Sequence, residues 1–408
     1  MFSEYRGIPW EARLLIYLSF IPNVAIGFIY TDLSYFLSDV QHLGPASAGV
    51  TIGVMGATVV AASIPMGLVA DRYGRRKMLI IGNVCASLSL IGFSLTTYVP
   101  AVLLVAVMEG VGEAAYAVSV GALLAEKAGD GKRTVAFSLL AFLGWVAGAV
   151  GSFSISSVIA LQAVGLDAQA SHAILYSAVA LLTLSITPFI YKVKESGPAG
   201  GEARRKGILP RKSGRFLLKF SVYSVAIAVG AGLFVPLMTL WFGRMYMVSD
   251  TVSGPALGLT NILTAGVVFM SPKLARKLGI VKAVVTTQAA STVFMVLIPS
   301  ATIFPIAAGL YAVRVFLMNL SNPLTQSLVM GLVSPDERGM ASGITAATWR
   351  LPNSLSAGVG GVLISAGMLA LPFYVATVLY AFGIAVFWLI FRGVTLPEDA
   401  GPSPSDST

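Results

Sequence analysis

The sequence GLVADRYGRRK, residues 67–77, separates two long apolar runs and contains four basic side chains. We call it the basic loop. Its two glycines lack a Cβ and so permit close helix approach and a tight turn. Asp71 stands beside several arginines, so a charge-assisted network can hold the ends of two helices together in one conformational state. We therefore expect a conformational latch, made of Gly67, Asp71, Arg72, Gly74, Arg75 and Arg76.

The composition predicts a membrane protein. Of the 408 residues, 56% are hydrophobic and only 11% are charged, whereas soluble proteins carry about a quarter charged residues. A chain this apolar would expose too much hydrophobic surface to water, so its solvent must be lipid. The net charge of +9 could suggest a nucleic-acid partner. The basic residues lie in short loops between apolar runs, however, which indicates membrane orientation and no nucleic acid.

A spanning helix needs about 20 apolar residues, and the sequence contains twelve such runs. We predict an all-α membrane protein with twelve transmembrane helices in two pseudo-symmetric six-helix bundles. The runs are 13–37, 46–70, 78–97, 99–125, 134–160, 172–191, 215–243, 252–272, 282–300, 302–333, 340–366 and 370–391.

The basic residues fix the expected topology. With the N-terminus inside, all of the 27 Lys and Arg residues lie in cytoplasmic segments except Arg244, Arg314 and Arg350, as the positive-inside rule requires. We predict a multi-pass protein of the cell membrane with both termini in the cytoplasm. The expected domains are a bundle at 1–191, a basic, Gly- and Pro-rich cytoplasmic linker at 192–214, a bundle at 215–392 and a disordered tail at 393–408.

The two halves look related. The segment PKLARKLGIVK, residues 272–282, is a weaker copy of the basic loop, and Gly279 matches Gly74 at an offset of 205 residues. Arg133 and Arg338, in two other predicted loops, are separated by the same offset. One offset in two separate loops indicates internal duplication, which is typical of transporters with a midplane site between their halves.

The basic loop closely resembles the signature loop of the major facilitator superfamily. Residues 272–282 and the Asp-Glu-Arg-Gly at 336–339 resemble that family more weakly, and the six-plus-six plan extends the resemblance over essentially the whole chain. The resemblance implies a secondary transporter that works by alternating access. The sequence contains no P-loop, no metal-spaced His/Cys cluster and no nucleophile–histidine pair, so we expect neither an enzyme nor a cofactor. His42 and His172 fall near predicted outer helix ends, and two distant histidines make no metal site. A monomer suffices for transport.

Ionisable residues at membrane depth are the sharpest functional signal, because each costs several kcal/mol unless it faces a cavity or a partner. A buried structural ion pair is the competing interpretation. Glu109 and Glu113 are four residues apart and share a helical face, so in a low dielectric they should not both be ionised, and one can carry a proton. We expect Asp32, Glu113 and Glu109 to couple transport to protons, with Asp32 and Glu113 as the pair.

The second half contributes arginines instead of acids. Arg314 lies 205 residues after Glu109, and we expect these two to form a gate or a substrate anchor. Further side chains could line a central cavity. The predicted substrate-binding or gating residues are Arg314, Arg350, Tyr30, Tyr116, Asn319 and Trp349.

Residues 109–116, EGVGEAAY, resemble a stretch of spinster-type lipid transporters and, more loosely, of anion:proton symporters in the same superfamily. In those relatives the residues that match Glu113 and Asp32 are implicated in protonation. They also carry an arginine where this chain has Ala106, so Arg314 or Arg350 would have to replace it. Gly144, Gly148 and Gly151 resemble the antiporter motif of drug exporters, with Ala149 in place of its proline, although generic packing accounts for such glycines as well.

The leading hypothesis is therefore a proton-coupled secondary transporter that exports amphipathic or drug-like molecules. The alternatives are a proton symporter that imports a small organic anion bound by Arg314 or Arg350, a lysolipid or lipid transporter, and a membrane sensor without transport. In each case the partners are a small-molecule or lipid-like substrate, protons and the lipid bilayer.

Overall fold

The computed structural model describes residues 7–129, 132–193, 195, 213–334 and 337–393, and every regular element among them is a helix. Ten helical stretches are long and apolar enough to cross a membrane, and α13 with α14 makes an eleventh if counted as one broken span. α17 (Arg338–Ser365) has 28 residues, which is enough to span a bilayer. Each of the predicted runs coincides with a helical stretch, and the predicted all-α, multi-span fold is confirmed.

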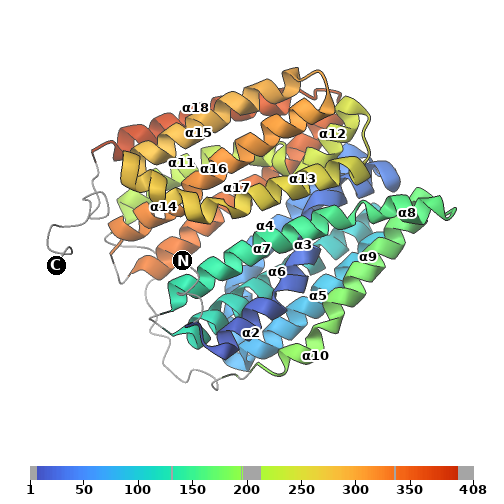
Figure 1. Ribbon diagram of the computed structural model, residues 1–408, viewed down its shortest axis with the longest axis horizontal. Coiled ribbons are helices and arrows are strands. Elements are labelled where there is room, and N and C mark those ends of the chain that lie inside the picture. The colour runs from blue at the N-terminus through green and yellow to red at the C-terminus, as the bar shows by residue number, and fades with distance from the viewer. Residues whose placement is uncertain (1–6, 130–131, 194, 196–212, 335–336, 394–408) are drawn as a thin grey trace. The chain divides into compact units, whose positions relative to one another are not determined.

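The chain forms two compact units. Unit 1 consists of Met1–Ala203, Phe234–Ala265 and Ser354–Leu369. In it α6 packs against α4 and α5, and α5 packs against α9 (Figure 1). Its elements are α2 (Trp10–Leu18), α3 (Phe20–Tyr35), the π-helical turn η1 (Phe36–Val40), α4 (Gly44–Tyr73), α5 (Arg75–Leu95), α6 (Val99–Ala128), α7 (Arg133–Ser154), α8 (Ser157–Ala163), α9 (Ala168–Ser185), α10 (Thr187–Ile190), the 3-10 turn η2 (Val235–Leu237), α12 (Met238–Tyr246), α13 (Asp250–Ala265) and the last turns of α17.

Unit 2 consists of Arg204–Leu233, Gly266–Asn353 and Ala370–Thr408. In it α11 packs against α18, and α15 packs against both α16 and α18. Its elements are α11 (Gly214–Gly232), α14 (Val267–Leu278), α15 (Ile280–Leu297), the 3-10 turn η3 (Ile298–Ser300), α16 (Phe304–Leu332), the first part of α17 and α18 (Leu371–Phe391).

The units divide the chain differently from the predicted bundles. α12, α13 and the end of α17 come from the second sequence half, yet they pack within unit 1. The bundle bounds 1–191 and 215–392 stay a prediction. Most of the predicted linker and all of the predicted tail beyond Gly393 lie outside the described residues.

The duplication is visible in the backbone. Gly74 ends α4 with a φ of 106°, and Gly279 ends α14 with a φ of 78°. The Gly74 amide donates to the Ala70 carbonyl at 2.9 Å, and the Gly279 amide donates to the Ala275 carbonyl at 2.8 Å. Such positive φ angles suit glycine because it has no Cβ. The same turn at the same offset supports the predicted internal repeat.

Glycines bring α3 and α7 of unit 1 into backbone contact. A Cβ on Gly27 would lie 2.3 Å from the Cα of Gly148, and a Cβ on Gly151 would lie 2.1 Å from the Val24 carbonyl oxygen. Small residues commonly permit such close approach in membranes, where van der Waals packing replaces the hydrophobic effect between helices. These glycines of α7 therefore serve helix packing.

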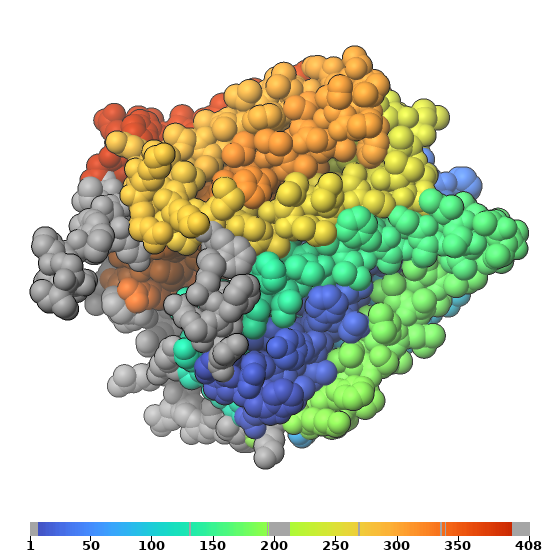
Figure 2. Space-filling model, in the orientation of Figure 1, coloured from blue at the N-terminus to red at the C-terminus, as the bar shows by residue number. Residues whose placement is uncertain are grey.

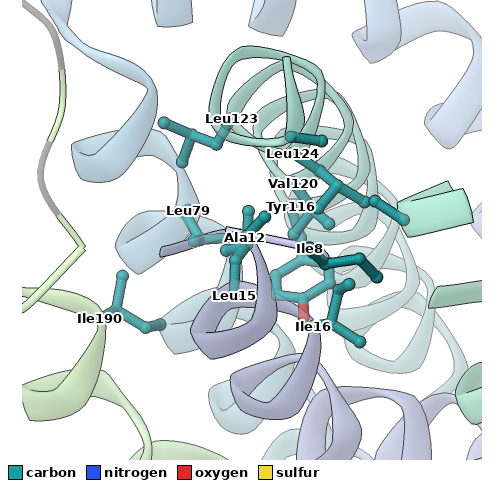
Figure 3. Close-up of a cluster of buried hydrophobic side chains, with 12 residues drawn as sticks. Ile8, Ala12, Leu15, Ile16, Leu79, Tyr116, Val120, Leu123, Leu124 and Ile190 are labelled. Carbon is teal, nitrogen blue, oxygen red and sulfur yellow. The ribbon is translucent and has the colours of Figure 1, made fainter. Parts of the chain in front are cut away.

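An apolar cluster packs around α2 in unit 1 (Figure 3). Leu15 of α2 and Leu123 of α6 are almost completely buried there, and the Tyr116 ring lies beside Ile16. Tyr116, predicted at a substrate cavity, is a member of this cluster and also lines a small cavity beside it. The cluster comprises Ile8, Ala12, Leu15, Ile16, Leu79, Tyr116, Val120, Leu123, Leu124, Ala128, Ala136 and Ile190.

Large apolar side chains cover the outside of the helices. α8 and α9 contact each other and are both visible at the surface of unit 1 (Figure 2). Ile159 of α8 and Leu181 of α9 are more than half exposed. On α18 of unit 2, Val378 and Leu389 are likewise exposed. These surfaces suit a hydrocarbon solvent, and in water they would be an aggregation liability.

The α3–α7 contact makes a testable prediction. Gly151→Ala should destabilise the purified protein by about 1–3 kcal/mol, because the new methyl group forces the two backbones apart. Gly121→Ala in α6 is the matched control, since a Cβ there meets nothing within 4 Å. Thermal unfolding in one detergent should give a lower midpoint for Gly151→Ala only. Equal midpoints for the two variants would contradict this packing.

Candidate functional site

The basic loop lies at one end of unit 1, and its arginines contact several segments. Arg75 approaches Asp71 at 3.1 Å and Glu126 of α6 at 3.4 Å. Arg76 donates to the Tyr191 carbonyl oxygen, just after α10, at 3.2 Å. The loop therefore connects the ends of α4 and α5 with the end of α6 and the segment after α10.

Glu195 completes this network. Its carboxylate accepts hydrogen bonds from the backbone amides of Arg75 at 2.5 Å and Arg76 at 3.4 Å, at the N-terminus of α5, where negative charge is favoured. A Cβ on Gly74 would lie 3.0 Å from Glu195 Oε2. Sequence reasoning missed Glu195 because it falls in the predicted linker, 120 residues from Arg75.

Two of the six predicted latch residues play a smaller part. A Cβ on Gly67 would lie 3.6 Å from the Val118 side chain, an ordinary van der Waals separation, so no close helix approach depends on Gly67. The Arg72 guanidinium lies 5.5 Å from the ring centroid of the adjacent Tyr73. The network is therefore centred on Arg75 and Glu195.

Glu109 and Glu113 lie on successive turns of α6 and are both buried. They line a small cavity of about 20 Å³ together with Tyr116 and Asn83, which is enough for one water molecule. The Tyr30 hydroxyl donates to Glu113 Oε2 at 3.0 Å. Among the described residues, Glu109 Oε2 has no hydrogen-bond partner. Two carboxylates this close repel each other and lack hydration, so this acid pair is suited to hold a proton.

Asp32 lies in a different group of side chains. Asp32 of α3, His172 of α9 and Asp250 of α13 are each at most 2% exposed, and one ligand atom from each lies within 4.8 Å of the others. We call these three residues the Asp–His–Asp cluster. The hypothesis that Asp32 pairs with Glu113 is therefore corrected: Asp32 belongs to this cluster, and Glu113 belongs with Glu109 and Tyr30.

Hydrogen bonds fix the tautomer of His172. Its Nδ1 lies 2.7 Å from the Ala168 carbonyl oxygen, which can only accept, so Nδ1 carries a hydrogen. Its Nε2 lies 2.7 Å from Asp250 Oδ2. Two such atoms approach this closely only with a proton between them, so the pair holds one on either the imidazole or the carboxyl.

The sequence signals for His172 and Asp250 were weak. His172 was set aside because it was considered only with the distant His42, and Asp250 stands at the predicted start of a span, where an acid can still reach water. The two residues are 78 positions apart in the chain. Only the packing of α9 beside α3 and of α13 beside α3 brings the three members of the cluster together.

Both arginines expected at the substrate site lie in unit 2. Arg314 of α16 is buried, donates to the Tyr380 hydroxyl and lies over the Tyr380 ring with 5.4 Å to its centroid. Arg350 of α17 is exposed. The described contacts of Arg314 thus include an aromatic hydroxyl of its own unit, and Glu109 belongs to the other unit.

Unit 2 contains a cavity of about 330 Å³ between α11, α16 and α17. Its lining combines aromatic and thioether groups with neutral hydroxyl and amide groups, and neither Arg314 nor Arg350 is among the lining residues. Trp349, expected at a substrate cavity, is one of them. Asn319 bonds instead to the Val315 carbonyl and to Asn322, which does line the cavity. The lining residues are Phe220, Tyr223, Ser224, Ile227, Met318, Asn322, Thr325, Gln326, Val329, Met330, Ser342, Thr345, Ala346 and Trp349.

Known structures share this architecture. A mutant form of the nucleoside transporter NupG has a TM-score of 0.77 at 14% identity, covering 93% of this chain and 100% of that chain. A bacterial homolog of the human lysosomal transporter Spinster, inward-facing and unoccupied, has a TM-score of 0.75 at 13% identity, covering 94% and 96%. A D-xylose–proton symporter has a TM-score of 0.75 at 14% identity, covering 96% and 99%.

At these sequence identities the structural similarity shows the fold and gives no information about the substrate of this chain. No curated protein matches the chain significantly. The sequence profile of the Major Facilitator Superfamily matches residues 15–357, which is most of the chain and includes the basic loop, the acid pair and the unit 2 cavity. The helical architecture, the repeated Gly74 and Gly279 turns and this match agree, and they also agree with the prediction that the chain is not an enzyme. The chain belongs to the Major Facilitator Superfamily of transporters.

Proposed function

We propose that this transporter moves small, neutral, amphipathic molecules across the cell membrane by alternating access, coupled to protons. The observation that carries the coupling is the buried acid pair of Glu109 and Glu113 beside a water-sized cavity. An ion gradient is the natural energy source for such a fold, because a carboxyl that gains and loses a proton as its surroundings change can link that gradient to movement.

The acid pair has the parts that a proton carrier requires. Burial and mutual repulsion disfavour two negative charges, so the pair retains a proton. The two acids differ in their contacts: Glu113 accepts a hydrogen bond from the Tyr30 hydroxyl at 3.0 Å, whereas Glu109 Oε2 has no hydrogen-bond partner among the described residues. Tyr30 is 41% exposed, so Glu113, unlike Glu109, has a partner that is not enclosed in the core.

The unit 2 cavity supports a neutral substrate. Its volume of about 330 Å³ is at the small end of the range for ligand pockets. Asn322, Gln326 and Thr325 offer hydrogen-bond donors and acceptors, and Trp349 and Phe220 offer apolar faces. Such a lining suits a molecule with a flat or apolar part and several uncharged polar groups.

The alternatives have less support. An organic anion would require Arg314 or Arg350 at the substrate, and neither is among the residues that line the described cavity. A lipid would require an opening toward the bilayer, and a sensor would use the acid pair without flux. For the direction we retain export. Its one support is the resemblance of the α7 glycines to the antiporter motif, and Gly148 and Gly151 also pack against α3. A monomer with both termini in the cytoplasm, as the basic residues predict, completes the proposal.

The basic loop is proposed as a conformational latch. Its network joins α4, α5, α6 and Glu195, so it can hold the ends of these helices in one arrangement. Partly exposed ion pairs contribute little individually. A carboxylate on two amides at a helix N-terminus contributes more, so we assign the larger share to Glu195.

The first prediction concerns the acid pair. In proteoliposomes with an imposed pH gradient, Glu113→Gln and Glu109→Gln should each abolish gradient-driven accumulation of a transported solute, because the pair can no longer exchange a proton. Exchange of solute without a gradient should persist. Asp167→Asn is the matched control, since Asp167 is an exposed acid at the α9 N-terminus and asparagine caps equally well. Undiminished accumulation in both glutamine variants would refute the coupling assignment.

The second prediction concerns the substrate. A panel of neutral, anionic and cationic derivatives of one aromatic scaffold should show competition by the neutral members. Trp349→Ala should raise the half-saturation concentration about 10- to 100-fold, which corresponds to about 1.5–3 kcal/mol of lost apolar contact. Trp388→Ala on α18, which is not a lining residue, is the control. Preference for the anionic derivative would favour the organic-anion alternative.

The third prediction concerns the latch. Glu195→Gln should lower the free energy of unfolding by about 1–2 kcal/mol, because it removes the charge from two charge-assisted hydrogen bonds at the start of α5. Asp71→Asn should change it by less than about 0.5 kcal/mol, since Asp71 is mostly exposed and such pairs contribute little. Thermal unfolding of both variants at low and high salt measures this. A larger loss in Asp71→Asn would overturn the assignment.

A further inference from the structure

The proposed function leaves Asp32, His172 and Asp250 without a role. The Asp–His–Asp cluster takes one residue each from α3, α9 and α13, and all three are buried. The end of α10 is joined to the basic loop through Tyr191 and Arg76, so His172, near the start of α9, lies at the opposite end of unit 1. Here α3 and α9 come from the first sequence repeat and α13 from the second.

Close packing surrounds the cluster. A Cβ on Gly254 of α13 would lie 2.9 Å from the Ser152 carbonyl oxygen of α7, and a Cβ on Gly258 would lie 3.2 Å from the Ala149 carbonyl oxygen. The ring of Phe36 stacks on His172 with 5.5 Å between centroids. Such packing leaves no room for bulk water. Without hydration the cluster must have little or no net charge, and it reaches that state by binding protons.

The cluster has no net charge when it holds two protons in addition to the hydrogen on His172 Nδ1. One lies between His172 Nε2 and Asp250 Oδ2, which are 2.7 Å apart. Asp32 is completely buried and interacts with both Asp250 and the Tyr176 hydroxyl. Two carboxyl groups this close in a site without water repel each other when both are ionised, so Asp32 is a neutral acid in this arrangement. Removing either proton would leave a net negative charge in an apolar surrounding.

The neighbouring groups in the described part of unit 1 do not supply a positive charge that could balance a deprotonated cluster. Tyr35 of α3 and Tyr176 of α9 interact electrostatically with the cluster and are neutral phenols. Asp39 of η1 and Arg244 of α12 neutralise each other at 2.9 Å. α8 has no ionisable residue, and the only one on α7 is Arg133, its first residue, at the other end of the helix. The net charge of the site therefore depends on the protons that the three cluster residues themselves hold.

The geometry fits a proton better than a metal ion. The 2.7 Å between nitrogen and oxygen is the length of a charge-assisted hydrogen bond. Two ligands about 2.0–2.1 Å from a tetrahedral zinc ion would be separated by about 3.3 Å. A metal would have to push His172 and Asp250 apart, in a site where neighbouring helices are already in backbone contact.

We propose that the Asp–His–Asp cluster is a proton-binding site that holds this end of unit 1 closed, by fastening α13 of the second repeat to α3 and α9 of the first. When α13 separates, water hydrates both carboxyl groups and they ionise at neutral pH, and His172 loses its partner. Closing therefore takes up at least one proton, and the ratio of open to closed molecules rises about tenfold per pH unit for each proton. This inference rests on alternating access in the proposed function, and on neither the substrate nor the acid pair.

The test measures opening directly, without substrate or gradient. The full chain carries Cys85→Ala, so that spin labels attach only at Gln169→Cys near the start of α9 and at Val252→Cys in the first turn of α13. Both positions are exposed. Pulsed electron resonance in lipid nanodiscs should give one short distance at low pH. A second, longer distance should grow with pH, with the population ratio changing by about tenfold or more per unit.

Conservative variants separate protonation from packing. Asp32→Asn imitates the protonated acid and should reduce the steepness of the pH response, and Asp32→Asn with Asp250→Asn should remove it and keep the short distance. Asp39→Asn is the control: it weakens a contact with Arg244 that lies outside the cluster and should shift the ratio equally at every pH.

Three results would overturn the proposal. They are distances in the parent chain that do not change with pH, a pH response that survives in the double variant, and a response to zinc or a chelator at constant pH, which would make the cluster a metal site. Because the assay involves no flux, loss of coupled transport in the glutamine variants of the acid pair leaves this test unaffected, and the two proposals fail separately.

Discussion

A carboxyl group at membrane depth must hold a proton or contact a positive partner, because lipid supplies neither water nor counter-ions. This constraint governs both acidic sites of unit 1. Glu109 and Glu113 face one water-sized cavity, and Asp32 and Asp250 face one imidazole. Each site contains two carboxyl groups, so one positive charge could neutralise only one of them. We propose that proton binding is a condition for the observed packing, and that the packing in turn determines when a proton can leave.

The two sequence repeats have diverged around a common backbone. The turns at Gly74 and Gly279 have retained the same hydrogen bonds, since a positive φ at a helix end admits few alternatives to glycine. The side chains at membrane depth have changed: position 109 is an acid, and its counterpart 314 is an arginine bound to Tyr380. We attribute proton binding to the first repeat and the neutral cavity to the second, with α13 linking the second repeat to a proton site of the first.

Sequence alone predicted the helical stretches, because an apolar run of about 20 residues has the length that a bilayer requires of a helix. It also singled out Glu109, Glu113 and Asp32, since ionisable residues are rare at that depth, and all three are buried; their part in proton coupling stays a prediction. Sequence alone did not predict which side chains contact each buried acid. Asp32 was paired with Glu113 because both are buried acids, whereas the fold places Asp32 with His172 and Asp250. The expected place of Tyr116 at a substrate cavity stays a prediction: Tyr116 belongs to the apolar core around α2 and also lines the small cavity of the acid pair. Contacts between distant segments, such as Glu195 with Arg75, depend on helix packing that hydropathy does not contain.

The central claim is that buried carboxyl groups of this protein carry protons at neutral pH. Infrared difference spectroscopy of the membrane-embedded chain, between about pH 6 and about pH 9, detects protonated carboxyl groups by their carbonyl stretch and its shift in heavy water. We expect a band in the protonated-carboxyl region at the lower pH, weakened in Glu109→Gln and weakened separately in Asp32→Asn. A parent spectrum with no such band, or a band that neither variant changes, would contradict the account.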